Sequence, residues 1–484
     1  MKYIRHNTRA ISILMIVLFS TLVVYGMVML STQGNRFVSS FYNTYVRQKK
    51  EDVQKGSISD KNDIVLAHSA MEGEHIKRFY HDDLLLRQAV VHVVGDEAGY
   101  VANGMEGFMA SYLYGLQDSL LNRWGNFFRG EKQEGYDLQL TIDATLCKEI
   151  ATLVRQNPHL QNKKGAVVVM NYETGAVEAS MSFPLFDPYM VDELKQDKGR
   201  PFFNRATQGT YIPGSTFKIV TAAAALQQDA LKNTSFFCGG QLKIREDDTN
   251  FITDAGTNLQ ENKIVSHGQL SLQEAFMVSC NNSFAQIALT LRHHNLSTVA
   301  EHFGFNENFL FRDVVVENST FPADMTPWEL AWAGAGQSTA LATPMHLCLI
   351  VSAIANDGVM MEPRLLKTVT TRDGKEILHF SAKPYSTLFR EEPEIIEQLQ
   401  AFLYSVVNDK NGTGQAASLT FPKVYGKTGT AQVTGQEDSA LFVGYLDSEK
   451  NPYALSIIFE GAGSGGSVAA PLAQDIFQAL LERE

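Results

Sequence analysis

The chain has 484 residues, of which 44% are hydrophobic and 19% are charged. This length and composition allow two or three domains with a sizeable core, and they exclude an intrinsically disordered protein. The formal net charge is −12, and no long stripe of lysine and arginine is present. Because nucleic-acid binding requires cations that neutralise phosphates, we expect no nucleic-acid partner.

Four cysteines are spread along the chain without a C-x-x-C pair: Cys147, Cys238, Cys280 and Cys348. This spacing predicts neither a disulfide framework nor a zinc site. The twelve histidines are scattered and include no H-E-x-x-H helix, so we expect them to be structural or surface residues.

A membrane-spanning helix is predicted near the N-terminus. Residues Ala10–Leu30 form an uncharged run, and at about 1.5 Å per residue such a helix covers the roughly 30 Å hydrocarbon core of a bilayer. A cleaved signal peptide is the alternative, but the run is long for one and no A-x-A-like site follows it. Lys2, Arg5 and Arg9 precede the run, whereas Arg36 alone follows closely, which favours a cytoplasmic N-terminus and an extracytoplasmic remainder.

The segments after this run predict a small module. Ser31–Lys55 is polar and compatible with a helix, and Lys55–Ser69 indicates a turn, a short strand and another turn. The charged segment Arg129–Asp137 is typical of a linker. We therefore divide the first part of the chain into a cytoplasmic tail (1–9), an anchor (10–30) and a small α+β module with its linker (31–137).

A larger α/β domain is predicted over residues 138–484. It begins with a strand near Leu138, a helix over Ala144–Gln156 and a hairpin over Lys164–Pro184. Apolar helical patterns follow, and the chain then returns to strands before a final helix. The expected late elements are strands within 424–433, 439–447 and 453–461 and a helix over about Ala470–Leu481. Strands at both ends with helices between them predict a sheet flanked by helices.

A serine and a lysine stand together at the head of an alanine-rich apolar helix. Ser215 and Lys218 are three positions apart after a Pro-Gly pair, so they project from one face of the first turn. A serine hydroxyl needs an adjacent base to become a nucleophile, and a desolvated lysine can supply it. For this S-x-x-K pattern alone, a helix-capping serine and a solvated lysine are at least as good an interpretation.

Two further motifs follow once each, in order: Ser279-Cys280-Asn281 at the start of a helix and Lys427-Thr428-Gly429-Thr430 on a strand. Alone, the first favours a helix cap. Gly426 to Thr428 also lacks the upstream glycine of a phosphate loop, because Phe421 stands there. The ordered trio of S-x-x-K, S-x-N and K-T-G is the active-site set of serine acyltransferases that react with penicillin.

These residue types have complementary chemistry. Ser279 can relay a proton to a leaving amine, and Asn281 offers an amide donor and acceptor. Lys427 and the hydroxyls of Thr428 and Thr430 can hold a carboxylate, while Gly429 allows close approach of substrate. The backbone N–H groups of Ser215 and Thr430 are the predicted oxyanion hole.

With these motifs, the chain resembles class B penicillin-binding proteins, the monofunctional peptidoglycan D,D-transpeptidases, over most of residues 10–484. It is most similar to the short subgroup with one anchor helix. Two stretches depart from the family pattern, namely Lys55–Asp63 in place of R-G-x-I-x-D-R-N-G and Gly336-Gln337-Ser338 in place of G-Q-G. Further family-like stretches are FFNRATQGTYIPGSTFK, LTIDATLC, SFPLFDP, SAIANDGVMMEPRLL and GGSVAAPLAQDIF.

The resemblance implies a penicillin-binding/β-lactamase-like α/β serine acyltransferase domain, with an antiparallel sheet flanked by helices, an α+β pedestal and one transmembrane helix. It implies that Ser215 attacks the penultimate D-alanine of a stem peptide, releases the terminal D-alanine and passes the acyl group to a neighbouring strand's amine. β-Lactams would acylate the same serine. Neither a cofactor nor a metal is implied. The implied partner is a SEDS-family glycosyltransferase in the bacterial cell membrane.

Two alternative functions remain open. A D,D-carboxypeptidase or β-lactamase would pass the acyl group to water; the predicted anchor and pedestal and the lack of an E-x-x-L-N stretch argue against the β-lactamase. A non-catalytic β-lactam sensor or division scaffold would need a cytoplasmic signalling domain, and nine residues precede the predicted span.

Overall fold

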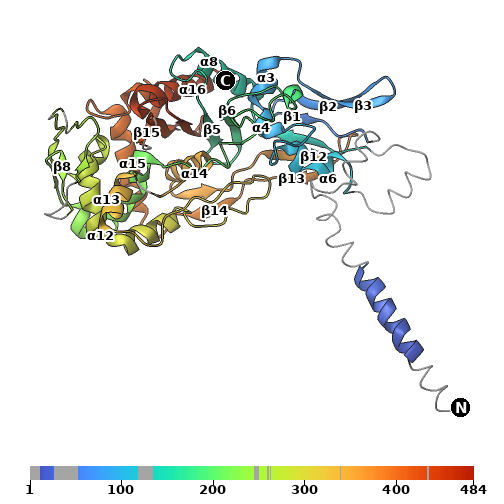
Figure 1. Ribbon diagram of the computed structural model, residues 1–484, viewed down its shortest axis with the longest axis horizontal. Helices are drawn as coiled ribbons and strands as arrows, with labels where there is room; N and C mark the ends of the chain where they lie inside the picture. The colour runs from blue at the N-terminus through green and yellow to red at the C-terminus, as the bar shows by residue number, and fades with distance from the viewer. Residues whose placement is uncertain are drawn as a thin grey trace.

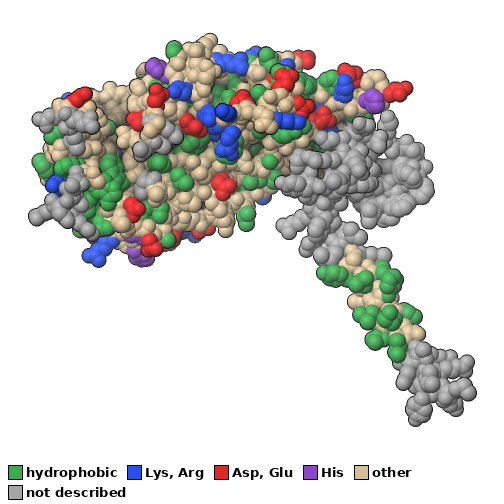
Figure 2. All heavy atoms as spheres, viewed as in Figure 1, with side chains coloured by type: hydrophobic (Ala, Val, Ile, Leu, Met, Phe, Trp, Pro, Cys, Tyr) green, Lys and Arg blue, Asp and Glu red, His purple; other side chains and the backbone are tan. Residues whose placement is uncertain are grey.

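The structure is a computed structural model that describes residues 11–26, 53–117, 134–244, 250–258, 261, 263–337, 339–432, 435 and 437–483. Residues 11–26 are helical, and their apolar side chains are exposed (Figure 2). The rest of the predicted anchor, the tail over 1–9 and most of the predicted polar segment and linker lie outside these ranges. Within the ranges, no helix combines the length and apolar character that crossing a membrane requires.

A five-stranded antiparallel sheet forms the centre of the larger domain (Figure 1). Its strand order is β15-β16-β17-β5-β6, so early and late strands of the domain share one sheet, as predicted, and β17 pairs with β5. β5 and β17 are buried on both faces, which explains why they consist mostly of β-branched and apolar residues. The strands are β5 (Gly165–Asn171), β6 (Val177–Phe183), β15 (Lys423–Ala431), β16 (Ser439–Asp447) and β17 (Tyr453–Phe459).

Helices cover both faces of this sheet. α8 (Ala144–Gln156) and α16 (Ala470–Leu481) contact one face, and the buried α14 (Pro344–Ala355) contacts the other (Figure 1). The helices predicted over Ala144–Gln156 and Ala470–Leu481 are both confirmed. α8 begins where predicted because the Asp143 carboxylate accepts the Leu146 N–H at 2.9 Å.

A helical region beside β15 carries the predicted nucleophile. Ser215 lies in the 3₁₀ turn η2 (Gly214–Phe217), which leads directly into α9 (Lys218–Leu226). All nine residues of α9 are buried, so this is the central helix that its apolar sequence predicts. Around it lie α10 (Asp229–Lys232), α11 (Leu272–Met277), α12 (Asn281–His302), α13 (Pro327–Ala335) and α15 (Pro393–Asn408).

Several short elements complete the larger domain. β7 (Phe236–Cys238) pairs with β10 (Gly268–Leu270), and β8 (Gln241–Leu242) pairs with β9 (Ile252–Thr253). These strands border the active-site end of the helical region. The remaining elements are β11 (Val359–Met361), β14 (Pro384–Thr387), the 3₁₀ turns η1 (Pro188–Met190) and η3 (Gln415–Ala417), and the π-helical turn η4 (Gly465–Ala469).

The N-terminal module contains a second sheet of six strands, in the order β13-β12-β4-β1-β2-β3. The sequence did not predict that β12, from the middle of the larger domain, would pair with β4 and so join the two modules, with β13 pairing on the other side of β12. The elements here are β1 (Ile58–Ser59), β2 (Val65–Glu72), β3 (His75–Tyr80), α3 (Leu84–Ala89), α4 (Val91–Val94), α5 (Met105–Phe108), α6 (Ala110–Leu113), β4 (Asp137–Leu140), β12 (Leu366–Thr370) and β13 (Glu376–His379). The boundary at residue 138 stays a prediction.

A buried ion cluster lies inside this module. Glu106 accepts hydrogen bonds from Lys55 at 3.1 Å and from Arg78 at 2.5 Å, and all three side chains are buried. Burial raises the pKa of the Glu106 carboxyl, but the two cations outweigh burial and lower it to about 2. Lys55 opens the stretch that departs from the family pattern, and here it holds the interior of the module together.

Candidate active site

Ser215 and Lys218 face each other as their spacing predicts. The Lys218 Nζ atom lies 2.9 Å from the Ser215 Oγ atom, because the 3₁₀ turn places residues i and i+3 on one side. Lys218 is fully buried, whereas Ser215 lines an open cavity. A buried amine in contact with an accessible hydroxyl is the arrangement that activates a serine nucleophile.

Two further contacts of Lys218 favour the neutral form of its amine. Its Nζ atom donates to the Ser279 backbone carbonyl at 2.8 Å and to the Asn281 Oδ1 atom at 2.7 Å. Both partners are obligate acceptors, so a neutral amine would use its two N–H groups there and turn its lone pair toward Ser215. Burial lowers the pKa of Lys218 to about 8, although nearby Cys280 and Asp254 partly oppose the shift. A useful fraction of Lys218 is therefore neutral near physiological pH.

Ser279 links the two lysines of the site. Its Oγ atom lies 3.2 Å from Lys218 Nζ and 2.9 Å from Lys427 Nζ. Its backbone adopts a φ of 58°, a left-handed conformation that is uncommon for serine. Burial and the positive charge of Lys218 together lower the pKa of Lys427 well below its usual range. The hydroxyl of Ser279 can therefore pass a proton between two amines that are both poised to release one.

Asn281 is the first residue of α12, so the motif stands at the start of a helix as predicted, and Cys280 is the N-cap residue of that helix. The Asn281 side-chain amide donates to the Thr253 carbonyl at 3.0 Å, and its backbone N–H donates to the Asp254 carboxylate. These two bonds orient the Asn281 carbonyl oxygen toward Lys218. Thr253 and Asp254 thus position the turn that carries the second motif.

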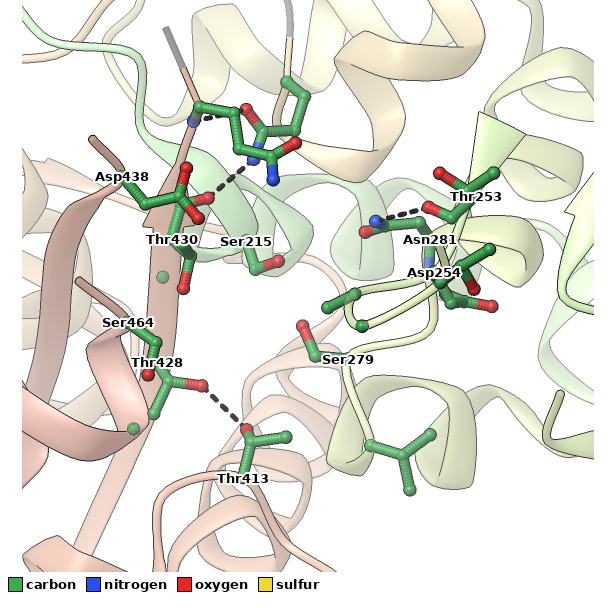
Figure 3. A pocket seen from close by; sticks show the side chains of 18 of the residues that line it. Ser215, Thr253, Asp254, Ser279, Asn281, Thr413, Thr428, Thr430, Asp438 and Ser464 are labelled. Atoms are coloured by element: carbon green, nitrogen blue, oxygen red, sulfur yellow. Dashed lines mark hydrogen bonds between the residues drawn. The ribbon is translucent and has the colours of Figure 1, made fainter. Parts of the chain in front are cut away.

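A cavity of about 570 Å³ opens between β15 and this turn (Figure 3). The hydroxyls of Ser215 and Ser279 face its middle, while Thr428 and Thr430 line the β15 side and Asn281 the opposite side. Lys427 is buried beneath the strand, in contact with Ser279. All eight predicted residues therefore meet in one place: Ser215, Lys218, Ser279, Asn281, Lys427, Thr428, Gly429 and Thr430. Their individual roles stay predictions.

Two glycines allow the nucleophile turn to press against β15. Gly214 has a φ of 55°, and a Cβ atom there would lie 2.8 Å from the Thr430 carbonyl oxygen. Gly336 has a φ of 89°, and its Cβ atom would lie 1.8 Å from the Gly214 carbonyl oxygen. Close backbone contact on both sides brings Ser215 beside Thr430, where the predicted oxyanion hole requires the two residues to be.

Comparison with known proteins agrees with this geometry. Residues 165–478 match the penicillin binding protein transpeptidase domain, which is more than half of the chain. The chain belongs to the penicillin-binding protein transpeptidase family. The match covers every one of the eight predicted residues, and it includes the whole five-stranded sheet.

Relatives of this penicillin-binding protein are similar over most of their length. Peptidoglycan D,D-transpeptidase PbpA of Mycolicibacterium smegmatis is 27% identical over 406 residues, which is 79% of this chain and 80% of PbpA. Peptidoglycan D,D-transpeptidase MrdA of Escherichia coli is 26% identical over 85% of this chain and 69% of MrdA. The imipenem acyl-enzyme structure of penicillin-binding protein A from M. tuberculosis has a TM-score of 0.77 at 24% identity, covering 89% of this chain and 99% of that one.

Two residues that support β15 were not predicted from the sequence. The Gln337 side chain donates to the Thr430 carbonyl at 2.6 Å and accepts from the Gln432 N–H at 3.2 Å. The hydroxyls of Thr413 and Thr428 are 2.7 Å apart. Gln337 belongs to Gly336-Gln337-Ser338, the stretch that departs from the family pattern. That departure could have pointed to Gln337 as a residue of the site. Ser338 lies outside the described residues.

A second group of side chains borders the cavity of this penicillin-binding protein. The potential metal ligands of four residues lie within 4.8 Å of one another: Cys238, Asp254, His267 and Cys280. Cys280 belongs to the S-x-N motif, and Asp254 and His267 line the cavity. The sequence did not predict this group, because its members are far apart along the chain and follow no metal-binding spacing.

Proposed function

We propose that this penicillin-binding protein is a peptidoglycan D,D-transpeptidase that cross-links stem peptides through an acyl-enzyme on Ser215. The observation that carries the proposal is the contact between the buried Lys218 amine and the Ser215 hydroxyl, with Ser279 bridging to Lys427. The D,D-transpeptidase relatives support the choice of substrate, a peptide ending in D-alanyl-D-alanine.

Acylation begins when Lys218 takes the proton of Ser215 and the Oγ atom attacks the carbonyl carbon of the penultimate D-alanine. The oxyanion that forms accepts hydrogen bonds from the backbone N–H groups of Ser215 and Thr430. The C–N bond then breaks, and the leaving amine needs a proton. Ser279 donates this proton, because Lys218 and Lys427 both lie close enough to return a proton to its hydroxyl.

The second half of the reaction runs in reverse with a different amine. The amine of a neighbouring stem peptide attacks the ester carbonyl and transfers its proton through Ser279 or Lys218. Ser215 leaves and recovers its proton from Lys218. The net change exchanges one peptide bond for another, so it requires neither an oxidant nor an external energy source.

In this proposal, β15 binds the donor peptide. A peptide laid along the strand would place its terminal carboxylate beside the hydroxyls of Thr428 and Thr430, near the buried Lys427 amine. Gly429 allows the strand to pack closely against the nucleophile turn, since a Cβ atom there would lie 3.0 Å from a Thr216 methyl group. On the other side, Asn281 can bind the peptide backbone.

Replacement of Ser215 by alanine tests the proposal. The full-length Ser215→Ala protein should not become labelled by a fluorescent penicillin and should not cross-link lipid-linked substrate, while its unfolding temperature stays close to that of wild type. Ser297→Ala, which changes a partly exposed serine on α12, is the matched control and should label normally. Labelling of the Ser215→Ala protein would assign the nucleophile elsewhere.

The hydrolase alternative is tested by the lifetime of the penicillin adduct. A deacylating water needs a carboxylate with a free lone pair, and general-base help contributes about 10² to 10⁴ in rate. Asp254 borders the cavity, but Asn281, Cys238 and Cys280 already donate to its oxygens. We expect the adduct to persist in intact-mass spectra long after free drug is removed. Rapid loss with accumulating hydrolysed penicillin would favour a β-lactamase.

We also propose an anchor over residues 10–30, an extracytoplasmic catalytic domain and a SEDS-family partner. The exposed apolar side chains of residues 11–26 support the anchor, because such a helix is unstable in water. A chain starting at Ser31 should remain soluble and react with penicillin, yet fail to stimulate a reconstituted SEDS glycosyltransferase. Equal stimulation by the full-length and the truncated protein would show that the anchor is not needed for docking to the SEDS glycosyltransferase.

A further inference from the structure

One carboxylate that lines the active-site cavity has no hydrogen-bond donor beside it. Asp438 lies directly before β16 and is half-buried. Its backbone carbonyl accepts the Gly463 N–H at 2.9 Å, but no described residue donates a hydrogen bond to its side chain. The other carboxylate that lines the cavity, Asp254, already accepts bonds from the Asn281 N–H and from a thiol. Among the described residues, Asp438 is therefore the carboxylate that the cavity can offer to a ligand.

The register of the sheet places Asp438 at the same end of the cavity as Thr430. Thr430 pairs with Ala440 across β15 and β16. Asp438 lies two positions before Ala440, and strand side chains two positions apart share a face. Gln432, two positions after Thr430, also lines the cavity. Figure 3 shows the side chains of Asp438 and Thr430 next to each other, above Ser215.

The proposed path of the donor peptide passes this end of the cavity. With its terminal carboxylate near Thr428 and its scissile carbonyl at the Thr430 N–H, the donor runs antiparallel to β15. Each further residue advances about 3.3 Å, so the residue that precedes D-alanyl-D-alanine lies between the levels of Thr430 and Gln432. β16 is two strand spacings from the donor, about 10 Å away. A long, flexible side chain such as that of lysine can cross this distance to Asp438.

The proposed reaction supplies a cation for this carboxylate. The acceptor is a neighbouring stem peptide that attacks through an amine, and donor and acceptor belong to the same polymer. A donor therefore carries the same amine, which is protonated near neutral pH while it is not reacting. A half-buried carboxylate attracts an ammonium group more strongly than an exposed one does, because water screens the pair less.

We propose that Asp438 binds the side-chain ammonium of the donor residue that precedes D-alanyl-D-alanine, and so selects donors that carry a lysine-type amine. This inference rests on the proposed transpeptidase function. Asp438 takes no part in proton transfer and acts on donor binding alone. The adjacent acid differs from it, because Glu437 is 77% exposed and pairs with Lys163 at 2.9 Å. Glu437 therefore provides a matched control for the loss of one negative charge.

Two synthetic donors test the ammonium site. Both are lysyl-D-alanyl-D-alanine peptides, one with a free and one with an acetylated side-chain amine, and release of D-alanine by the full-length protein gives kcat/KM for each. The wild type should prefer the free amine by about tenfold, mainly through KM, because a hydrogen bond between charged groups is lost on acetylation. Asp438→Asn should treat both donors alike, and Glu437→Gln should keep the wild-type preference. An unchanged preference in Asp438→Asn would overturn the inference.

Penicillins with modified side chains separate this inference from the proposed function, because their reaction with Ser215 requires no cross-linking. A penicillin whose side chain ends in a primary amine should acylate the wild type about tenfold faster than its N-acetyl form. Asp438→Lys should reverse the selectivity and favour the N-succinyl form, which carries a carboxylate. Equal rates for the free and acetylated forms in the wild type would overturn the ammonium site even if peptides were cross-linked. Absence of D-alanine release alongside the expected penicillin selectivity would reject the proposed function and support the site.

Discussion

The side-chain amide of Gln337 donates a hydrogen bond to the Thr430 backbone carbonyl across 2.6 Å. Gln337 follows the left-handed residue that ends α13, and Thr430 lies near the end of β15. The bond ties the helical side of the cavity to the strand proposed to bind substrate. The same amide accepts the Gln432 N–H, so one side chain satisfies two backbone groups where β15 ends.

Gln337→Ala should therefore weaken the alignment of β15 more than the stability of the fold. Loss of a hydrogen bond worth about 1 kcal/mol predicts an acylation rate constant that is ~5-fold lower, with a small change in unfolding temperature. Gln400→Ala is the matched control, because Gln400 donates a similar bond to the Ile354 carbonyl on α14. Stopped-flow labelling with fluorescent penicillin measures both. Equal effects of the two substitutions would mean that Gln337 has only a structural role.

Gly336→Ala should inactivate the protein through a steric overlap. Its Cβ atom would lie 1.8 Å from the carbonyl oxygen of Gly214, the residue that precedes the nucleophile. Gly374→Ala separates this overlap from backbone strain, because Gly374 has a similar φ of 85° but no atom within 4 Å of the added carbon. Strain alone costs about 1 to 2 kcal/mol. We expect Gly374→Ala to label at the wild-type rate and Gly336→Ala to label more than tenfold more slowly. Similar rates would contradict the tight packing of the turn.

The acylation rate should rise with pH through the titration of Lys218. Burial lowers the pKa of this amine to about 8, against partial opposition from Cys280 and Asp254, and only the neutral amine can accept the Ser215 proton. The rate should increase roughly tenfold per pH unit below the pKa and level off above about pH 8. Labelling rates between about pH 6 and about pH 10 measure the profile. A rate that falls as pH rises through this range would exclude neutral Lys218 as the base.

Removal of the buried charge on Glu106 should destabilise the N-terminal module. Glu106→Gln leaves Lys55 and Arg78 as buried cations without a countercharge, which costs about 3 to 5 kcal/mol. Glu72→Gln breaks the exposed ion pair with Lys77 and should cost less than about 1 kcal/mol. Chemical denaturation followed by circular dichroism compares the two free energies of unfolding. Similar values would mean that the Glu106 cluster contributes no more than a surface pair.

The sequence determined the family and the members of the active site through local patterns. Ser215 and Lys218 share a turn, and such short-range geometry depends only on backbone periodicity. The β5–β6 hairpin and helix α8 were likewise readable, because the two β-rich arms with their turn and the Asp143 cap act within a few positions. Chemistry confined to a turn or a strand can be predicted before the chain is folded.

Tertiary structure alone decided the features that depend on distant segments. The burial that lowers the Lys218 pKa is created by the helices around α9, and although the apolar sequence of α9 predicts a buried helix, only packing decides which helices enclose it. The pairing of β12 with β4 joins residues more than two hundred positions apart. Cys238 and Cys280 also meet only because the β7–β10 ladder and the cap of α12 converge. The burial of a side chain, and its distance from side chains in other segments, depend on how the helices and strands pack. Both therefore exist only once the chain has folded.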